Sequence, residues 1–336
     1  MERRQTLEKT VNRGPLGIRH RWWVLLFIIL NIVAVIFVKP VQPHIQVAPE
    51  NLTHEPLFTL PVIGEFYLTN TLVMLVLVLL VIFWLAYSVH RELKSGTLVP
   101  KGVAGLMEAL VEILYNLTES SAGKYAKTIF PWFATILIFV LVGNLMKLTP
   151  IVETFGLVHE VKEGGHALQE LLPGVVNILP GEVHEGETGY HIIPFFRGIP
   201  TDLNFTLALA LISVVMTQVI GVRAQGGAYF YKFFNVLNLF KKPFFGAMDF
   251  LVGLLELISE FAKILSFAFR LFGNMFAGAV LLFLVGSLIP VFMQSFVVLF
   301  EVFVGLIQAF VFGMLTMVFM AQATRGHGGE HGEGAH

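Results

Sequence analysis

Residues 246–286 read GAMDFLVGLLELISEFAKILSFAFRLFGNMFAGAVLLFLVG, and this stretch decides the fold. It is apolar apart from a few side chains, and a helix of this length rises about 60 Å. The hydrocarbon layer of a bilayer is only about 30 Å thick. A similar stretch follows at 288–322, and Gly286 and Pro290 mark the turn between them. We therefore expect a hairpin of two long helices that tilt strongly, kink, or run partly along the membrane plane.

The composition of the whole chain agrees with a membrane protein. Apolar residues make up 56% of its 336 residues and charged residues 13%, whereas soluble domains carry about 25% charged residues. Runs of about 20 apolar residues are long enough to cross hydrocarbon as a helix. Further runs of this kind lie at 22–38, 68–88, 128–148 and 203–222. The sequence predicts an all-α polytopic membrane protein with about six membrane helices, the last two forming the tilted hairpin.

The distribution of Lys and Arg predicts the orientation of these helices. Sixteen of them lie in the N-terminal segment, the 89–127 and 223–245 connections and the C-terminal tail, against three in the opposite connections. Cytoplasmic loops carry the excess of positive charge, so both termini are expected in the cytoplasm. The span 22–38 could instead be a signal peptide, but no small-residue cleavage site follows it, which favours an uncleaved anchor.

Two connections have patterns of their own. Residues 102–115 (GVAGLMEALVEILY) show helical apolar spacing and are expected to lie against the inner membrane surface. The outer connection, 149–200, holds seven Glu and four His but only two Lys or Arg. We expect a solvated loop there, and the functional alternative is an acidic funnel that concentrates cations.

Polar side chains follow one face of the 246–286 helix. Intervals of 4, 3, 7 and 4 residues keep them on that face: they are Glu256, Glu260, Lys263, Arg270 and Asn274, with Ser266 one turn before the arginine. An arginine stays protonated at physiological pH, and placing it at the centre of a bilayer costs at least about 2.5–3.5 kcal/mol. No carboxylate lies on its own face within one turn, so we expect its counter-charge to come from elsewhere, another chain included.

The 288–322 helix carries a second stripe, formed by Gln294, Glu301 and Gln308 at intervals of seven residues. This helix enters from the outer side, so its stripe runs from outside to mid-depth, whereas the first stripe starts at the inner side. If the hairpin turns near residue 287, Arg270 lies level with residue 304, and both stripes end near it. The pattern indicates two half-pathways, one open to each side, that meet at a fixed positive charge.

Other interpretations of these polar residues remain open. They could simply satisfy one another, Glu260 pairing with Lys263 and Glu301 with Gln308. The chain could be a secondary transporter that binds an anionic solute at Arg270, although such folds show inverted repeats and the first half of this chain has no counterparts of the two long helices. It could also be a structural subunit whose arginine only pairs with the acid of a neighbour.

Four segments resemble subunit a of the F-type ATP synthase. They are RLFGNMFAG at 270–278, QAFVFGMLT at 308–316, GNLMKLTP at 143–150 and PTDLNFTLALAL at 200–211. The resemblance covers roughly residues 60–323, and the arginine motif is highly specific. In that family the protein flanks a rotating ring of small c subunits, each with one intramembrane carboxylate, and provides two offset half-channels for protons.

The resemblance implies roles for several residues. Arg270 corresponds to the family's essential arginine, and Asn274 and Gln308 to its polar partners. Glu301 falls on a variable ionisable position, and Ala279 stands where the family commonly has another ionisable residue. Glu301 is thus expected to be the only carboxylate at the inner end of the inlet. The secondary half-channel candidates are Asp202, Asn204, Glu256, Ser266 and Gln294.

The resemblance also implies an organisation and partners. It assigns residues 61–323 to the subunit-a-like membrane domain. It says nothing about residues 1–60, which are expected to form an N-terminal cytoplasmic segment, an extra membrane anchor and an outer linker, and the Gly/His-rich composition of 324–336 indicates a disordered tail. The expected partners are the c-subunit ring, the peripheral-stalk b subunits, the remainder of the ATP synthase complex and the lipid bilayer of a bacterial plasma membrane, with no nucleic acid. The chain alone is expected to be non-catalytic, without cofactor or metal.

All eleven histidines lie outside the expected spans, which excludes a bis-histidine haem site there.

Overall fold

The computed structural model describes residues 46–325 apart from 54, 62–63, 95–99, 162–164, 173–174, 183–188, 234–242 and 290–291, together with scattered positions between 22 and 33. Five of the described helices are long and apolar enough to cross a membrane. The chain is therefore a mainly helical, multi-pass membrane protein. The expected first span, 22–38, lies largely outside the described residues, so a total of six spans stays a prediction.

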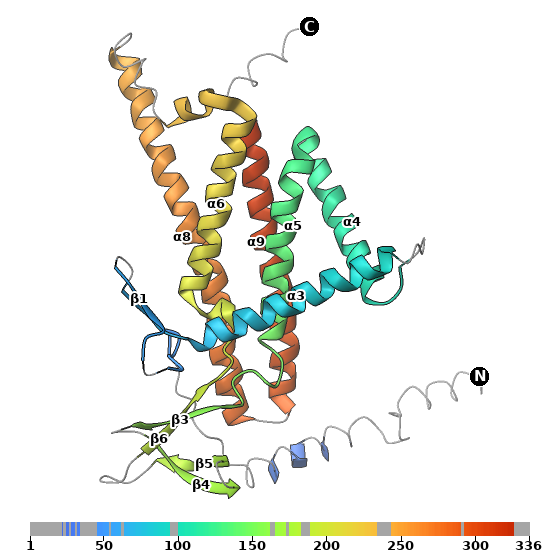
Figure 1. Cartoon of the computed structure of the whole chain (residues 1–336), viewed down its shortest axis with the longest axis vertical. Coiled ribbons are helices and arrows are strands. Elements are labelled where there is room, and N and C mark those ends of the chain that lie inside the picture. The colour runs from blue at the N-terminus through green and yellow to red at the C-terminus, as the bar shows by residue number, and fades with distance from the viewer. Residues whose placement is uncertain are drawn as a thin grey trace, which may run out of the picture. The chain divides into compact units, whose positions relative to one another are not determined.

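The long helices lie close to the expected ranges (Figure 1). They are α3 (Asn70–Lys94), α5 (Ala126–Met146), α6 (Leu203–Gln225), α8 (Pro243–Leu288) and α9 (Phe292–Thr324). Short 3-10 helices lie at η1 (Gly123–Tyr125), η2 (Ile199–Thr201) and η3 (Gly226–Lys232). The expected hairpin is confirmed: α8 continues to Leu288, past the expected turn near residue 287, and α9 begins at Phe292.

Helix α4 (Val103–Ala122) begins one residue into the segment 102–115 and covers the rest of it, so its helical pattern is confirmed. The chain reverses after it at Gly123, whose φ of 53° suits glycine better than other residues. Helix α4 then packs back on α5: the rings of Tyr115 and Phe130 meet edge to face with centroids 5.3 Å apart. Its position at the membrane surface stays a prediction.

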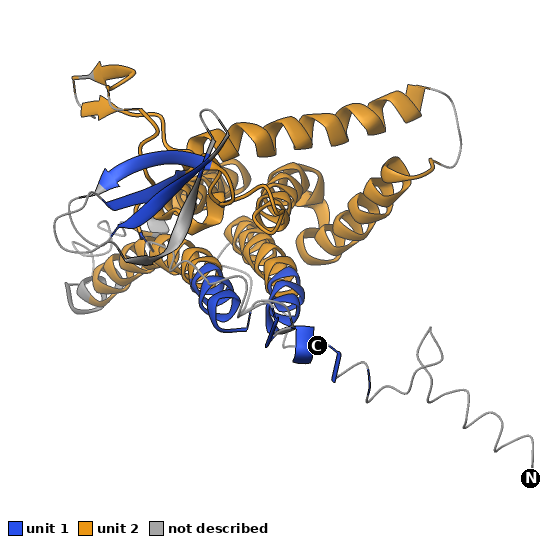
Figure 2. Ribbon diagram, turned by 90° about the horizontal axis from the view of Figure 1, so that it is seen from below, with its two compact units in different colours: residues 1–46, 156–193, 277–302 blue, residues 47–155, 194–276, 303–336 orange. Residues whose placement is uncertain are grey.

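The chain divides into two compact units, coloured separately in Figure 2. Unit 2 comprises residues 47–155, 194–276 and 303–336, and its core joins α5 and α6 to the parts of α8 and α9 in this unit. Its buried members include Ile136, Val140, Leu209, Ala210, Val214, Phe267, Ala268, Leu271, Met275, Ala309 and Phe312. Several are alanines, which let helix backbones approach closely where packing, and not the hydrophobic effect, drives association in lipid.

Helix α3 is arranged differently from the others in unit 2. Only the first part of α3 packs on α5, through Met74 and Val78, which have no exposed surface. Farther along, Phe83 and Tyr87 are 68% and 64% exposed. Figure 1 shows the reason: α3 crosses α5 and does not run beside it. If α3 spans the bilayer along its normal, α5 must therefore be strongly tilted.

Unit 1 comprises residues 1–46, 156–193 and 277–302 and contains a four-stranded sheet that the sequence analysis did not foresee. Its strands are β3 (Gly156–Val161), β4 (His166–Leu172), β5 (Val175–Glu182) and β6 (Gly189–Pro194), in the order β3-β6-β4-β5. A second, two-stranded sheet in unit 2 pairs β1 (Phe58–Leu60) with β2 (Gly64–Phe66). The connection 149–200 is therefore not a simple loop. The Pro–Gly pair at 173–174, between two segments rich in Leu, Val and Ile, was a hairpin signal that the acidic composition obscured.

Candidate functional site

Helix α8 has a buried and an exposed face around Arg270. Phe267, Leu271 and Met275 belong to the core of unit 2. Ser266, Arg270 and Asn274, spaced by four residues, are exposed. Because side chains four residues apart lie one above another on a helix, these three form a continuous polar strip on an otherwise apolar surface.

The guanidinium of Arg270 has little compensation within the described part of the chain. Its Nη2 donates to Oγ of Ser266 over 3.5 Å, which is long for a hydrogen bond. No carboxylate among the described residues forms an ion pair with it. The exposed cation is thus available to a group outside this chain.

The level of Arg270 in the hairpin differs from the expectation. The rings of Phe267 in α8 and Phe312 in α9 pack with centroids 5.1 Å apart. Because α8 and α9 run antiparallel, a residue three positions after Phe267 on α8 lies level with the residue three positions before Phe312 on α9. Arg270 therefore lies level with Ala309. The predicted level, residue 304, is wrong because the turn lies about three residues later than assumed. The correction places Arg270 close to the level of Gln308, which is half-buried.

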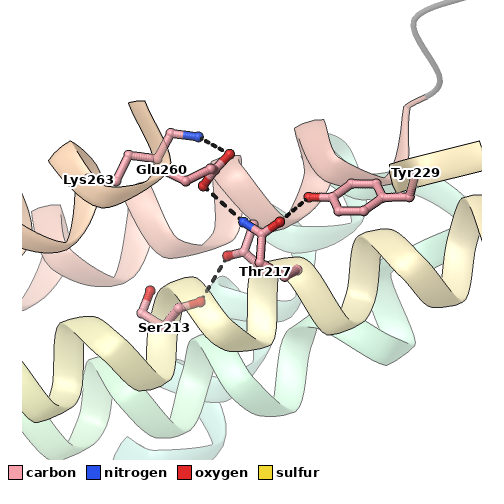
Figure 3. Close-up of polar contacts among 6 residues, drawn as sticks. Ser213, Thr217, Tyr229, Glu260 and Lys263 are labelled. Atoms are coloured by element: carbon pink, nitrogen blue, oxygen red, sulfur yellow. Dashed lines mark hydrogen bonds and ion pairs between the residues drawn. The ribbon is translucent and has the colours of Figure 1, made fainter. Parts of the chain in front are cut away.

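The N-terminal part of the first stripe, around Glu260, is a closed polar network (Figure 3). Glu260 is 7% exposed, and both of its carboxylate oxygens accept hydrogen bonds. Nζ of Lys263 donates to Oε1 over 2.8 Å, and Nε2 of Gln218 in α6 donates to Oε2 over 2.9 Å. The hydroxyl of Tyr229 in turn donates to Oε1 of Gln218 over 2.6 Å. The interpretation that Glu260 and Lys263 satisfy each other is therefore confirmed.

This network divides the stripe that the sequence analysis treated as one surface. Lys263 also lies over the ring of Phe319, with its Nζ 4.8 Å from the ring centroid, so it points towards α9. Arg270 and Asn274 instead lie on the exposed surface. Glu256 is half-buried and has partners of its own. Of the inner candidates, Ser266 is the one that shares the strip with Arg270.

In unit 1, Glu301 is 1% exposed, and its carboxylate packs against the backbone of Gly278. A β-carbon at Gly278 would lie 2.1 Å from its Oε1. Ala279, the next residue, is also buried. Gln294 packs over Gly286 in the same way, its Nε2 3.3 Å from where a β-carbon would be. Both residues of the second stripe in this unit thus face α8.

Asp202 has a structural role at the start of α6. It is 6% exposed, its Oδ1 accepts the backbone N–H of Asn204 over 2.9 Å, and its Oδ2 accepts the hydroxyl of Thr71 over 2.9 Å. This is the geometry of a helix N-cap. Asn204 itself is exposed.

Two buried polar residues of α5 were missed as site candidates, although their motif GNLMKLTP was noted. Asn144 is fully buried and donates to the carbonyl of Gly305, and Lys147 is 6% exposed and donates to the carbonyl of Met275. Nearby, burial raises the pKa of Glu153 above its usual value, and the positive charges of Lys147 and Arg197 oppose that shift. The signal in the sequence was a lysine near the end of an apolar span, where an unpaired charge is costly.

The fold and the strip around Arg270 define a class: a polytopic helical membrane protein with an exposed arginine on the first helix of a long hairpin. The chain belongs to the ATP synthase A chain family, whose model matches residues 71–321.

Individual relatives agree with the family match. The chain is 28% identical to ATP synthase subunit a 1 of Syntrophotalea carbinolica over 209 residues, covering 61% of this chain and 64% of the relative. It is 29% identical to ATP synthase subunit a of Halorhodospira halophila over 200 residues, covering 60% of each chain. The subunit a of Mycobacterium ulcerans is 28% identical over 215 residues, covering 64% of this chain and 69% of the relative. The match to the first two thus spans less than two thirds of their length.

Proposed function

We propose that the chain is the proton-translocating stator subunit of an F-type ATP synthase, with two offset half-channels that lead to a rotating c-ring and are separated by Arg270. One observation carries this proposal: the exposed guanidinium of Arg270 has no carboxylate partner among the described residues. A permanent cation on an apolar helix needs a counter-charge. The intramembrane carboxylate of a c subunit, which the family resemblance implies, would supply it.

In this mechanism a proton enters from the outer side past Gln294 to Glu301 and passes to a c-ring carboxylate. The neutral acid can then face lipid, because transferring it costs far less than transferring the ion. After nearly a full rotation it reaches the inner stripe near Glu256 and Ser266 and releases its proton. The charge of Arg270 favours the ionised carboxylate and repels a proton that would cross without rotation. Each charge moved gains about 2.3 kcal/mol per 100 mV of membrane potential, which rotation converts to torque.

The closed network around Glu260 supports assigning the inner route to Glu256 and Ser266, since both oxygens of Glu260 are already bound. The N-cap geometry of Asp202 supports a structural part for that residue beside any part in the inlet, and Asn204 is its exposed neighbour. Asn274 and Gln308 remain the polar neighbours of Arg270 in the proposal.

This function requires a c-subunit ring, peripheral-stalk b subunits and the remainder of the ATP synthase in a bacterial plasma membrane, with both termini cytoplasmic. ATP would be made in the soluble head, so the chain alone is non-catalytic. The test is purification in mild detergent. Co-isolation of a ring of small proteolipids and a soluble ATPase supports the proposal. Binding of a small anion by the lone chain would instead support a secondary transporter, which the family match does not favour.

A further inference from the structure

The last turn of α5 holds both helices of the hairpin by their backbones. Nδ2 of Asn144 donates to the carbonyl oxygen of Gly305 in α9 over 2.8 Å. Nζ of Lys147, three residues later, donates to the carbonyl oxygen of Met275 in α8, also over 2.8 Å. Residues three apart lie on the same side of a helix, so one side of α5 contacts both partners.

These bonds fix the position of a helix and not of a side chain. A backbone carbonyl has two lone pairs, so one inside a helix can accept a second donor besides its own helical N–H. The close approach on the α9 side depends on glycine. A β-carbon at Gly305 would lie 3.2 Å from Cβ of Asn144, and one at Gly313 would lie 2.9 Å from Cβ of Leu137. Helix α5 therefore packs closely along two turns of α9.

The side chain of Lys147 is itself held at both ends. Its stem passes over Gly198, where a β-carbon would lie only 2.6 Å from Cγ of the lysine. Its ammonium reaches the carbonyl of Met275. Lys147 is also the C-cap residue of α5, where the negative end of the helix dipole stabilises a cation. The lysine is thus a short, rigid link between the end of α5 and the middle of α8.

We propose that Lys147 and Asn144 are positioning residues that fix the axial register of α8 against α9 and so hold Arg270 at the level of its site. Arg270 lies five residues from Met275 on α8, about 7.5 Å along the axis, and Gln308 lies three residues from Gly305 on α9. Displacing a reacting group by about 1 Å can lower a rate about a hundredfold. This inference rests on the proposed function.

The test uses the assembled complex and a register readout that is independent of transport. The chain has no cysteine, and Phe267 packs against both Phe312 and Phe319, with ring centroids 5.1 and 5.6 Å away. The ratio of the 267–312 to the 267–319 cross-link in paired Cys variants therefore reports axial sliding. We expect Lys147→Met to change this ratio severalfold and to lower ATP-driven proton pumping per ATP hydrolysed by about tenfold. Lys127→Met, at an exposed position of the same helix, should change neither.

The possible outcomes separate the two proposals. If Lys147→Met leaves either the ratio or the pumping unchanged, the positioning role is wrong. If that variant does not assemble, the same two measurements are made on Gly198→Ala, which displaces the stem of Lys147 without removing its charge. An unchanged cross-link ratio or unchanged pumping in Gly198→Ala would then contradict the positioning role. Loss of pumping in Arg270→Ala together with normal pumping in Lys147→Met would reject only the positioning role. Normal pumping in Arg270→Ala would reject the proposed function itself, whatever the cross-links show.

Discussion

The carboxylate of Glu301 rests directly on the backbone of Gly278. A β-carbon at Gly278 would lie 2.1 Å from one carboxylate oxygen and 2.3 Å from the other, distances that no real contact of this kind allows. The glycine therefore creates the space in which this 1%-exposed acid lies. The absence of a side chain at residue 278 is as much a part of the site as the glutamate.

Gly278→Ala should therefore displace the carboxylate and slow proton entry. We expect passive proton flux through membrane vesicles stripped of the soluble head to fall by about tenfold or more, because small displacements at a reacting group are costly. Gly227→Ala is the matched control: no atom lies within 4 Å of a β-carbon there, so flux should be unchanged. Normal flux in Gly278→Ala would mean that the position of the Glu301 carboxylate does not matter.

Replacing the carboxylates themselves should reveal which one limits entry. Glu301→Gln removes the ionisable group of the inlet but keeps its size, so it should slow passive proton flux more than Glu256→Gln does. Glu256 is only half-buried, whereas Glu301 is 1% exposed, so we expect proton transfer to depend less on Glu256. Equal and negligible effects of the two substitutions would show that the inlet is assigned to the wrong residue.

Much of the architecture could be predicted because apolar length is a strong signal in membrane proteins. Helix α5 begins at Ala126 and α6 at Leu203, within two residues of the expected starts. The axial register between the two helices of the hairpin was harder to predict. It depends on the position of a turn that the sequence marks only by Gly286 and Pro290. An error of three residues in the turn moved the level of Arg270 from Ala309 to residue 304.

The part of the site that could not be predicted depends on contacts between helices. Helical spacing placed Glu260, Lys263 and Arg270 on one face, but it could not show that Gln218 of α6 reaches Glu260 and closes the inner network. Nor could it show that Lys147 crosses to the backbone of Met275. Such contacts depend on how the helices pack in three dimensions. The periodicity of polar residues along a single helix carries no information about them.

Arg270 should tolerate no substitution. Arg270→Ala removes the charge, and Arg270→Lys keeps a cation that can lose its proton in a site of low dielectric, whereas arginine stays charged. Both should abolish ATP-driven proton pumping in membrane vesicles. Arg223→Ala, at an exposed position near the end of α6, is the control for loss of a positive charge and should pump normally. Coupled pumping in the Arg270 variants would remove the central role of this residue.

Each residue of the Glu260 network should contribute to the thermal stability of the protein. Glu260→Leu leaves the largely buried ammonium of Lys263 without its carboxylate, and breaking a buried pair in this way costs about 3–5 kcal/mol. The double variant Glu260→Leu/Lys263→Met removes both charges and should be less destabilised than the single variant. Thermal unfolding of the detergent-solubilised complex measures both. Additive losses would show that the two residues are not coupled.

Substitutions at Asp202 can separate a structural role from a transport role at the N-terminal end of α6. Asp202→Ala removes the N-cap, at a cost of about 0.5–2 kcal/mol, and also the bond from Thr71. Thermal unfolding should therefore occur at a lower temperature in this variant, whereas Asn204→Ala, at an exposed neighbour, should change it little. Asp202→Asn is the informative third variant, because asparagine caps a helix about as well as aspartate but carries no charge. If capping is the role of Asp202, this variant keeps both stability and passive proton flux. If its carboxylate also conducts protons, flux falls while stability is retained.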